Sequence, residues 1–273
     1  MGTTARAAAL ITGASAGLGA EFARQLAAQG VDLVLVARDE ARLEALAAEL
    51  RTAHGAAVEV LAADLAEPNG LERVATRLSA RDAPIDILVN NAGFGVFESF
   101  EASSIAAERR LHEVVSWAPL RLAHAAIPGM LERRRGWILN VASAAAYLPS
   151  GSYGAAKAGV VALSRALAAR YRRRGIRVTA LCPGLLDTEF HERMGVDHLP
   201  PRLPAIAWAD TARVAREGLD ALRRGKPVLV SDWRYRLVRP LMAVLPDRVL
   251  ERLGSTPARA TRTAPLDTAG GAP

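Results

Sequence analysis

The sequence is poor in cysteine, in aromatic residues and in long hydrophobic runs, and each scarcity excludes something. Cys182 is the single cysteine among 273 residues, so no internal disulfide can form and we expect a protein of the reducing cytoplasm. Aromatic residues make up 5% of the chain, too few for a surface that stacks single-stranded nucleic-acid bases. No run of about eighteen uncharged apolar residues occurs, which excludes a transmembrane helix.

The formal net charge of +7 does not by itself indicate nucleic-acid binding, because the basic residues are spread along the whole chain. The arginine triplets at 133–135 and 172–174 lie where helical patterns end, and cations there complement the helix dipole. We therefore expect no nucleic-acid partner. The N-terminus leads directly into a strand and a glycine-rich turn, so we expect no cleaved signal peptide.

Lysine is scarcer still. Of the 35 basic residues only Lys157 and Lys226 are lysine, and all others are arginine. A position that keeps lysine in such a chain is a candidate for chemistry that a guanidinium cannot perform.

Apolar runs of strand length alternate with amphipathic helical patterns along most of the chain. The runs are nearly continuous in apolar residues, which is typical of parallel strands buried on both faces. The predicted strands are Ala8–Thr12, Asp32–Ala37, Ala57–Ala62, Ile85–Asn90, Gly136–Val141, Ile176–Cys182 and Pro227–Val230. The predicted helices are Leu18–Gln29, Glu40–His54, Gly70–Arg81, Arg109–Arg134, Ser152–Arg174 and Thr211–Arg223.

This alternation predicts an α/β fold of the Rossmann type, a doubly wound parallel sheet of about seven strands with helices on both faces. We expect one catalytic domain over residues 1–254, in which 232–254 form a basic helical extension. Residues 255–273 are expected to be a disordered tail.

The first predicted strand ends in the sequence Thr-Gly-Ala-Ser-Ala-Gly-Leu-Gly, which opens a helix. Glycines at these positions let the backbone turn tightly and approach a pyrophosphate, and the helix N-terminus offers free N–H groups. The pattern predicts a dinucleotide site that includes Gly13, Ser15, Gly17, Leu18 and Gly19.

The end of the second strand predicts which dinucleotide is bound. An NAD enzyme of this fold usually has an acidic residue there, but this chain has Ala37 followed by Arg38. A guanidinium can pair with a 2′-phosphate, so NADP(H) is favoured over NAD(H). Asp39 follows and would partly neutralise Arg38.

Two further segments follow predicted strands. Asp64 and Leu65 come after the third strand, with a carboxylate placed to accept from the adenine amino group. Asn91, Ala92 and Gly93 come after the fourth strand, and their small size lets a backbone lie against the cofactor.

With these residues in order, the chain resembles the short-chain dehydrogenase/reductase family in its compact, single-domain form. The resemblance rests on TGASAGLG, the Asp64–Leu65 pair and the sequence Asn-Asn-Ala-Gly at 90–93, and it covers about residues 7 to 230. It implies an oxidoreductase that transfers hydride between a nicotinamide cofactor and a carbonyl or alcohol.

The catalytic half of the chain carries Ser143 after the fifth strand, then Tyr153 and Lys157 on the next helix. Residues four apart lie on one helix face, so the Lys157 ammonium and the nicotinamide ring should lower the pKa of the Tyr153 phenol. Tyr153 could then exchange a proton with the substrate oxygen, which Ser143 would also hydrogen-bond. Lys157 can additionally donate to the nicotinamide ribose. The family resemblance implies the same roles.

The segment after the sixth strand matches the family's Pro-Gly-x-x-x-Thr turn. The resemblance implies that Pro183, Gly184, Leu186 and Thr188 hold the carboxamide of nicotinamide. No sequence pattern indicates a metal site, and Cys182 is expected to be a buried small residue rather than a nucleophile.

Two features depart from the family pattern. Val115 stands where many members carry an asparagine that supports the lysine through a bound water, and a slip of one residue to Ser116 is disfavoured by the helical phase. Ser143 and Tyr153 are also only ten residues apart, fewer than is usual, which shortens the loop beside the substrate.

Two alternatives to the enzyme hypothesis remain open on the sequence. Val115 favours a catalytically weak NADP(H)-binding sensor or scaffold over an active enzyme. The basic segment 235–253 could lie on a membrane surface, although packing on its own domain or on another subunit is the simpler interpretation. The substrate is expected to be an apolar carbonyl or alcohol, and the assembly a homodimer or homotetramer paired through the long helices, as in relatives.

Overall fold

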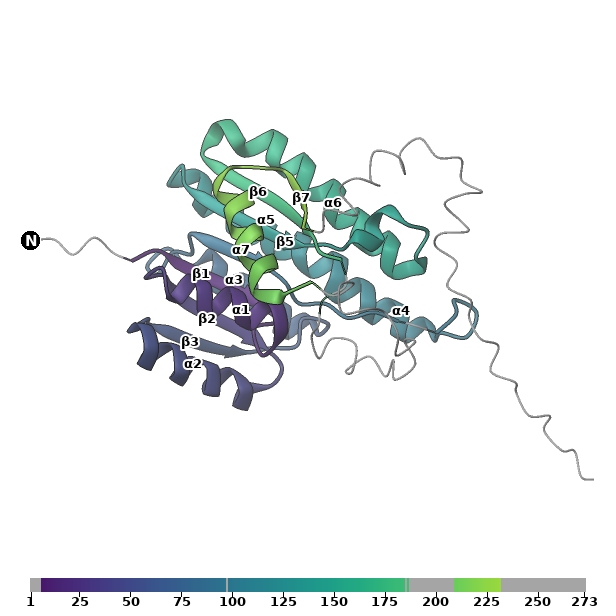
Figure 1. The fold of residues 1–273 in the computed structure, drawn as a ribbon, viewed down its shortest axis with the longest axis horizontal. Helices are drawn as coiled ribbons and strands as arrows, with labels where there is room; N and C mark the ends of the chain where they lie inside the picture. The colour runs from purple at the N-terminus through teal and green to yellow at the C-terminus, as the bar shows by residue number, and fades with distance from the viewer. Residues whose placement is uncertain (1–5, 97, 185, 187–208, 232–273) are drawn as a thin grey trace, which may run out of the picture.

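The computed structural model describes residues 6–96, 98–184, 186 and 209–231 (Figure 1). Its seven strands form one sheet, parallel throughout, in the order β3-β2-β1-β4-β5-β6-β7. The strands are β1 Ala8–Thr12, β2 Asp32–Ala37, β3 Val58–Ala62, β4 Ile87–Asn90, β5 Gly136–Val141, β6 Ile176–Cys182 and β7 Val228–Val230. The predicted doubly wound α/β fold is confirmed.

Three strands begin later than predicted. Before β4, Asp86 already bonds both neighbouring strands: its N–H donates to the Ala8 carbonyl and its own carbonyl accepts from the Trp137 N–H, both at 2.8 Å, and its carboxylate accepts from the Arg135 guanidinium at 2.9 Å. The strand itself begins at the next residue, Ile87. Pro227 precedes β7 and, having no N–H, can only accept, which it does from Ala180. The third late start is β3, which begins at Val58 rather than Ala57.

Helices cover both faces of the sheet (Figure 1). One face packs against α1, α2 and α7, and the other against α3, α5 and α6, in two separate apolar clusters. These helices are α1 Gly17–Ala27, α2 Glu40–His54, α3 Pro68–Ser79, α5 Ala118–Glu132, α6 Gly151–Tyr171 and α7 Thr211–Arg223. Strands buried on both faces explain the nearly continuous apolar runs of the sequence.

The predicted helix Arg109–Arg134 differs most from the structure. The helical run starts earlier, with α4 at Ile105–His112, because the Ser104 side chain caps it by accepting from the Ala107 N–H. A π-helical turn, Glu113–Trp117, then leads into α5. Pro119 lacks an N–H and cannot bond the carbonyl of Val115, so the wider i+5 pattern upstream of it relieves that mismatch.

Two short 3-10 segments complete the described elements. One spans Ala144–Tyr147 between β5 and α6, and the other spans Arg172–Arg174, where the predicted helix to Arg174 tightens after Tyr171. Because all strands are parallel, the loops after β1 to β6 meet at the carboxyl edge of the sheet. This edge carries every sequence-predicted site residue that the structure describes.

Some predictions fall outside the described residues: Thr188, the basic extension 232–254 and the tail 255–273. Within the described ranges, no helix has the length and apolar character needed to cross a membrane. The same ranges contain no group of three or more His, Cys, Asp or Glu side chains placed to hold a metal ion.

Candidate active site

The glycine-rich turn lies at the switch point of the sheet, where the chain leaves β1 toward β2 on one side and β4 pairs on the other. Gly13 and Gly17 have positive φ angles of 67° and 52°, a conformation that favours glycine. A Cβ on Gly19 would lie 2.1 Å from the Gly13 carbonyl oxygen, so α1 packs against the turn with no room for a side chain. Ser15 lies in the same turn, and Leu18 is buried in the core beneath it.

Asn91 ties this turn to the end of β4. Its side-chain amide donates to the carbonyls of Thr12 at 3.0 Å and Gly13 at 3.2 Å. The Thr12 hydroxyl in turn accepts from the backbone N–H groups of Asn91 and Ala92, both at 3.0 Å. The sequence indicated Thr12 only as the end of a strand. A polar residue closing a buried strand was the signal for this second role.

The N-terminus of α1 has no side-chain cap and no acidic residue in its first turn, since its N-cap is Ala16. By contrast, Asp39 caps α2 and Asp210 caps α7. The first N–H groups of α1 therefore keep their hydrogen-bonding capacity and their positive potential for an anion. This is the local chemistry that a pyrophosphate requires.

Arg38 lies at the end of β2, and its side chain is exposed. The expected neutralisation by Asp39 does not take place: the Asp39 carboxylate accepts from the Arg42 N–H at 3.0 Å and pairs with the Arg42 guanidinium at 3.4 Å. Within the part of the chain that the structure describes, the Arg38 guanidinium has no ion-pair partner. It is close enough to Asp64 to lower the pKa of that carboxyl.

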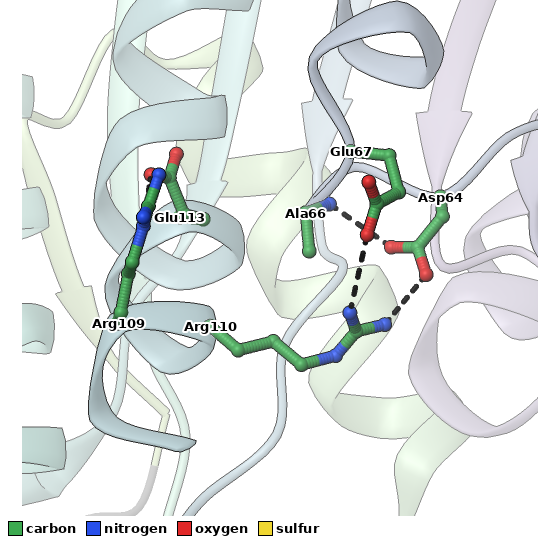
Figure 2. A network of polar contacts seen from close by, with 6 residues as sticks. All are labelled: Asp64, Ala66, Glu67, Arg109, Arg110 and Glu113. Carbon is green, nitrogen blue, oxygen red and sulfur yellow. Dashed lines mark hydrogen bonds and ion pairs between the residues drawn. The ribbon is translucent and has the colours of Figure 1, made fainter. Parts of the chain in front are cut away.

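Asp64 follows β3 and is held from two sides. Its Oδ1 accepts from the Ala66 N–H at 2.9 Å, and its Oδ2 accepts from the Arg110 guanidinium at 2.5 Å (Figure 2). Burial alone would raise the pKa of Asp64, but these hydrogen bonds outweigh burial and hold the pKa below its ordinary value. Leu65 beside it is buried in the core. No sequence pattern indicated Arg110.

Ser143 ends the segment after β5 and has two partners. Its hydroxyl accepts from the Ala145 N–H at 3.1 Å, which caps the 3-10 turn, and it hydrogen-bonds the Tyr153 phenol. The shortened loop between them therefore still brings the two hydroxyls together. The Ser143 hydroxyl thus caps the 3-10 turn and contacts Tyr153 at the same time.

Tyr153 lies in the first turn of α6, partly buried beside an apolar cluster of Leu111, Val115 and Ala156. Burial raises the pKa of its phenol to about 12, and the hydrogen bond with Ser143 lowers it only in part. The expectation of a lowered pKa is therefore wrong for the protein's own residues. In an apolar surrounding the neutral phenol is favoured over the phenolate.

Lys157 is buried one turn along α6, 4% exposed. Its Nζ donates to the Val141 carbonyl oxygen at 2.8 Å and lies 5.7 Å from the centre of the Tyr153 ring. Burial lowers the pKa of this amine to about 8, partly opposed by the thiol of Cys182. The ammonium thus faces Tyr153, and among the residues that the structure describes it has no carboxylate partner.

Val115 is 1% exposed and lies in the π-helical turn. A Cβ placed on Gly93 would lie 3.8 Å from Val115 Cγ2 and 3.4 Å from Lys157 Nζ, so both side chains flank the same glycine. Ser116 instead lines an open cleft of about 380 Å³ on the outer face, with Arg109 and Trp117. The residue that faces the lysine is therefore an apolar one.

The turn after β6 closes the site. The Pro183 carbonyl accepts from the Ala144 N–H at 2.8 Å, which joins this turn to the Ser143 segment. Gly184 follows, and Leu186 pairs with Ala209 in an isolated parallel bridge and packs against the α1 side of the core. Thr188, predicted to belong to this turn, lies outside the described residues.

A buried polar chain that the sequence did not indicate crosses the sheet behind the site. The Asn90 amide donates to the Asn140 side chain at 2.8 Å, and Asn140 donates to the Ser164 hydroxyl at 2.9 Å. The chain links β4, which leads to the cofactor candidates Asn91–Gly93, with β5 and α6, which position the catalytic candidates. Buried hydrogen bonds of this kind fix strand and helix positions relative to each other.

Comparison with known proteins agrees with this geometry. The family model described as short chain dehydrogenase matches residues 7–198. The chain belongs to the short-chain dehydrogenase family. The predicted resemblance is thereby confirmed, and the protein is an oxidoreductase of that family.

Individual relatives span most of the chain. A short-chain dehydrogenase from Sphingobium yanoikuyae, solved in complex with NADPH, is 36% identical with a TM-score of 0.78, covering 88% of this chain and 96% of its own. The bulky-bulky ketone specific alcohol dehydrogenase from Comamonas testosteroni is 31% identical with a TM-score of 0.74, covering 88% and 95%. The 1-deoxy-11-beta-hydroxypentalenate dehydrogenase of Streptomyces exfoliatus is 36% identical over 187 residues, 66% of this chain and 68% of its own.

Proposed function

We propose that this short-chain dehydrogenase reduces an apolar carbonyl compound with NADPH, with Tyr153 as the proton donor. The observation that carries the proposal is the convergence of three side chains at the carboxyl edge of the sheet. Ser143 hydrogen-bonds Tyr153, and Lys157 lies 5.7 Å from its ring, all beside the glycine turn. Bound NADPH would supply the hydride.

The protein's residues fit the cofactor from end to end. The uncapped N-terminus of α1 suits the pyrophosphate, and the close packing of Gly13 and Gly19 keeps the turn free of side chains. In this proposal Asp64 and Arg38 would bind the adenosine, and Asn91, Ala92 and Gly93 would lie against the cofactor between its adenosine and nicotinamide ends. Pro183, Gly184, Leu186 and Thr188 would hold the carboxamide, with Lys157 on the ribose.

The raised pKa of Tyr153 suits the reductive direction. A phenol with a pKa of about 12 is fully protonated at neutral pH and can donate to the oxygen of a carbonyl. Ser143 can hydrogen-bond the same oxygen and hold it in line. The Lys157 ammonium, still largely protonated below a pKa of about 8, stabilises the phenolate that donation leaves behind.

The absorbance of NADPH and NADH, followed across a panel of ketones, aldehydes and quinones, tests this proposal. We expect wild type to oxidise NADPH with at least one apolar carbonyl, and Tyr153→Phe to lose at least about a hundredfold in kcat with unchanged NADPH affinity. Full activity of Tyr153→Phe would contradict the assigned proton donor.

A second candidate is a weakly active or inactive NADP(H)-binding sensor or scaffold, which the buried Val115 favours. A valine flanking Lys157 cannot hold the water that an asparagine supports there, so the route that resupplies the proton is interrupted. Adding Val115→Asn to the same panel separates the two. A silent wild type that binds NADPH and is activated by Val115→Asn would favour the sensor.

The substrate class rests on the residues around the site and on the relatives. Phe94 and Val96 pack in the apolar cluster beside Tyr153. The similar Comamonas testosteroni enzyme is described as specific for bulky-bulky ketones, and the Streptomyces exfoliatus enzyme as a dehydrogenase of a hydroxypentalenate. These descriptions agree with an apolar carbonyl or alcohol of some bulk.

For the assembly we keep the expectation of a homodimer or homotetramer in the cytoplasm. Trp117 is 49% exposed and Leu120 40% exposed on the outer face of the α4–α5 run, where a second copy would cover them. Sedimentation velocity measures this directly, and a monomer at micromolar concentration would contradict it. No nucleic-acid or membrane partner is proposed.

A further inference from the structure

Arg110 reaches from α4 to the end of β3 and contacts a residue that lies 46 positions away in the sequence. Its Nη2 lies 2.5 Å from Asp64 Oδ2, and its Nη1 lies 3.8 Å from Glu67 Oε1 (Figure 2). The neighbouring Arg109 points away and pairs with Glu113 along the helix. Of these two arginines, only Arg110 joins the helical run that carries Val115 to Asp64 at the end of β3.

The backbone of Asp64 is fixed independently of this contact. A Cβ on Gly70 would lie 2.2 Å from the Asp64 carbonyl oxygen, so the first turn of α3 presses directly on it. The same carbonyl accepts from the Glu67 N–H at 3.2 Å. The backbone is fixed and Oδ1 is held by the Ala66 N–H. The contact with Arg110 therefore sets the orientation of the second carboxylate oxygen, Oδ2.

The carboxylate keeps its capacity for a ligand. Each carboxylate oxygen has two acceptor positions, and the protein uses one on Oδ1 and one on Oδ2. The Asp64 side chain is 26% exposed, so an amino group can approach it. Arg110 therefore orients the Asp64 carboxylate and leaves acceptor positions on it for a ligand.

The charges of the cluster balance only with Arg110 included. Asp64 and Glu67 are two negative charges, and Arg110 and Arg38 are two positive ones. Without Arg110 a net negative charge would remain beside Arg38, where a 2′-phosphate carrying nearly two negative charges would be repelled. With Arg110, the cluster as a whole is neutral, and Asp64, Glu67 and Arg110 together leave one net negative charge beside Arg38 instead of two.

We propose that Arg110 is a positioning and specificity residue for the adenosine half of NADP(H): it aims the Asp64 carboxylate at the adenine amino group and cancels its charge beside the 2′-phosphate position at Arg38. The inference rests on the proposed NADP(H) cofactor. Arg110 does not touch the reacting atoms, so its effect lies in cofactor affinity and selectivity and not in the chemical step.

The test is fluorescence titration of NADPH and NADH, without substrate, against wild type and three variants. Arg110→Gln removes both the positive charge and the guanidinium group that can donate two hydrogen bonds. We expect about tenfold weaker NADPH binding but only about threefold weaker NADH binding. Arg110→Lys keeps the charge but not the two-pronged geometry, so both cofactors should weaken about threefold with an unchanged NADH-to-NADPH ratio. Arg121→Gln removes a comparable arginine–carboxylate pair, with Glu72, about 16 Å further along the helix and should change neither affinity more than twofold.

Each outcome decides between the possibilities. Suppose that wild type prefers NADPH and that Arg110→Gln has the same ratio of NADH to NADPH dissociation constants as wild type. This result overturns the inference about Arg110 and leaves the cofactor proposal intact, because a purely structural Arg110 would weaken the binding of both cofactors equally. If Arg110→Lys shows the same changed NADH-to-NADPH ratio as Arg110→Gln, the argument from charge is overturned. A wild type that does not prefer NADPH overturns the cofactor proposal, and this inference with it.

Discussion

In the β1–β3 half of the site the carboxylates are already paired before any ligand binds. Asp64 is held by Arg110, and Asp39 by Arg42. In the β4–β6 half, Lys157 is buried with a backbone carbonyl as its hydrogen-bond acceptor, and the pKa of Tyr153 is raised to about 12. One half balances charge by ion pairs, and the other keeps titratable groups in an apolar surrounding.

The difference agrees with the roles proposed for the two halves. Recognition of adenosine needs fixed donors and acceptors, and paired, partly exposed side chains provide them at small cost. Proton transfer needs a group whose two protonation states are close in free energy when the substrate is present. Burial raises the pKa of Tyr153 and lowers the pKa of Lys157, so it favours the neutral form of both groups. Bound cofactor and substrate would then set the protonation state of each group.

The largest effect expected from breaking the recognition half comes from Gly19→Ala. Its Cβ would lie 2.1 Å from the Gly13 carbonyl oxygen and 2.6 Å from the Asn91 amide, so the turn must shift. We expect about 3 kcal/mol of lost stability and at least thirtyfold weaker NADPH binding, measured by urea denaturation and fluorescence titration.

Gly159→Ala on exposed α6 is the matched control. Nothing lies within 4 Å of a Cβ there, so it should stabilise the protein by about 0.5–1 kcal/mol and leave binding unchanged. Equal behaviour of the two variants would show that the turn tolerates a side chain.

Lys157→Met tests the catalytic half through stability. The pKa of Lys157 falls from 10.5 to about 8 on folding, so below pH 8 both states are protonated and wild type carries the full cost of a buried ammonium. At pH 7 we expect the variant to be more stable by about 2 kcal/mol, with activity lost.

Between pH 8 and 10.5 the folded amine is neutral while the unfolded one still holds its proton, so wild type gains stability with rising pH. The advantage of Lys157→Met should therefore shrink over this window in urea denaturation curves. An advantage that is independent of pH would mean that packing, not charge, separates the two proteins.

The smallest effect concerns Arg38→Gln. Because Arg38 has no ion-pair partner among the described residues, its loss should not lower stability, but NADPH binding should weaken about five- to tenfold with NADH binding unchanged. Titration of both cofactors measures this. Arg216→Gln removes the same charge from the exposed surface of α7, and equal losses in both variants would point to general electrostatics instead.

Much of the site follows from short-range sequence patterns. Tyr153 and Lys157 share a helix face because four residues make about one turn, and Gly13, Gly17 and Gly19 mark a turn that only glycine permits. The strand order could also be anticipated, because parallel strands linked by helices allow few topologies. Helix ends were less predictable: neither the Ser104 cap that starts the run at Ile105 nor the π-helical turn before Pro119 was predicted, although both depend on the local sequence.

The alternation of strands and helices, the glycine turn and the candidates Ser143, Tyr153 and Lys157 could be predicted from the amino-acid sequence, because each depends on neighbours only a few residues away. The contacts of Arg110 with Asp64 and of Asn91 with Gly13, and the raised pKa of Tyr153, are visible only in the folded chain. Such contacts join residues far apart in the chain, and pKa values depend on the solvent that packing excludes. The spacing of residues along a sequence predicts neither these long-range contacts nor the pKa values.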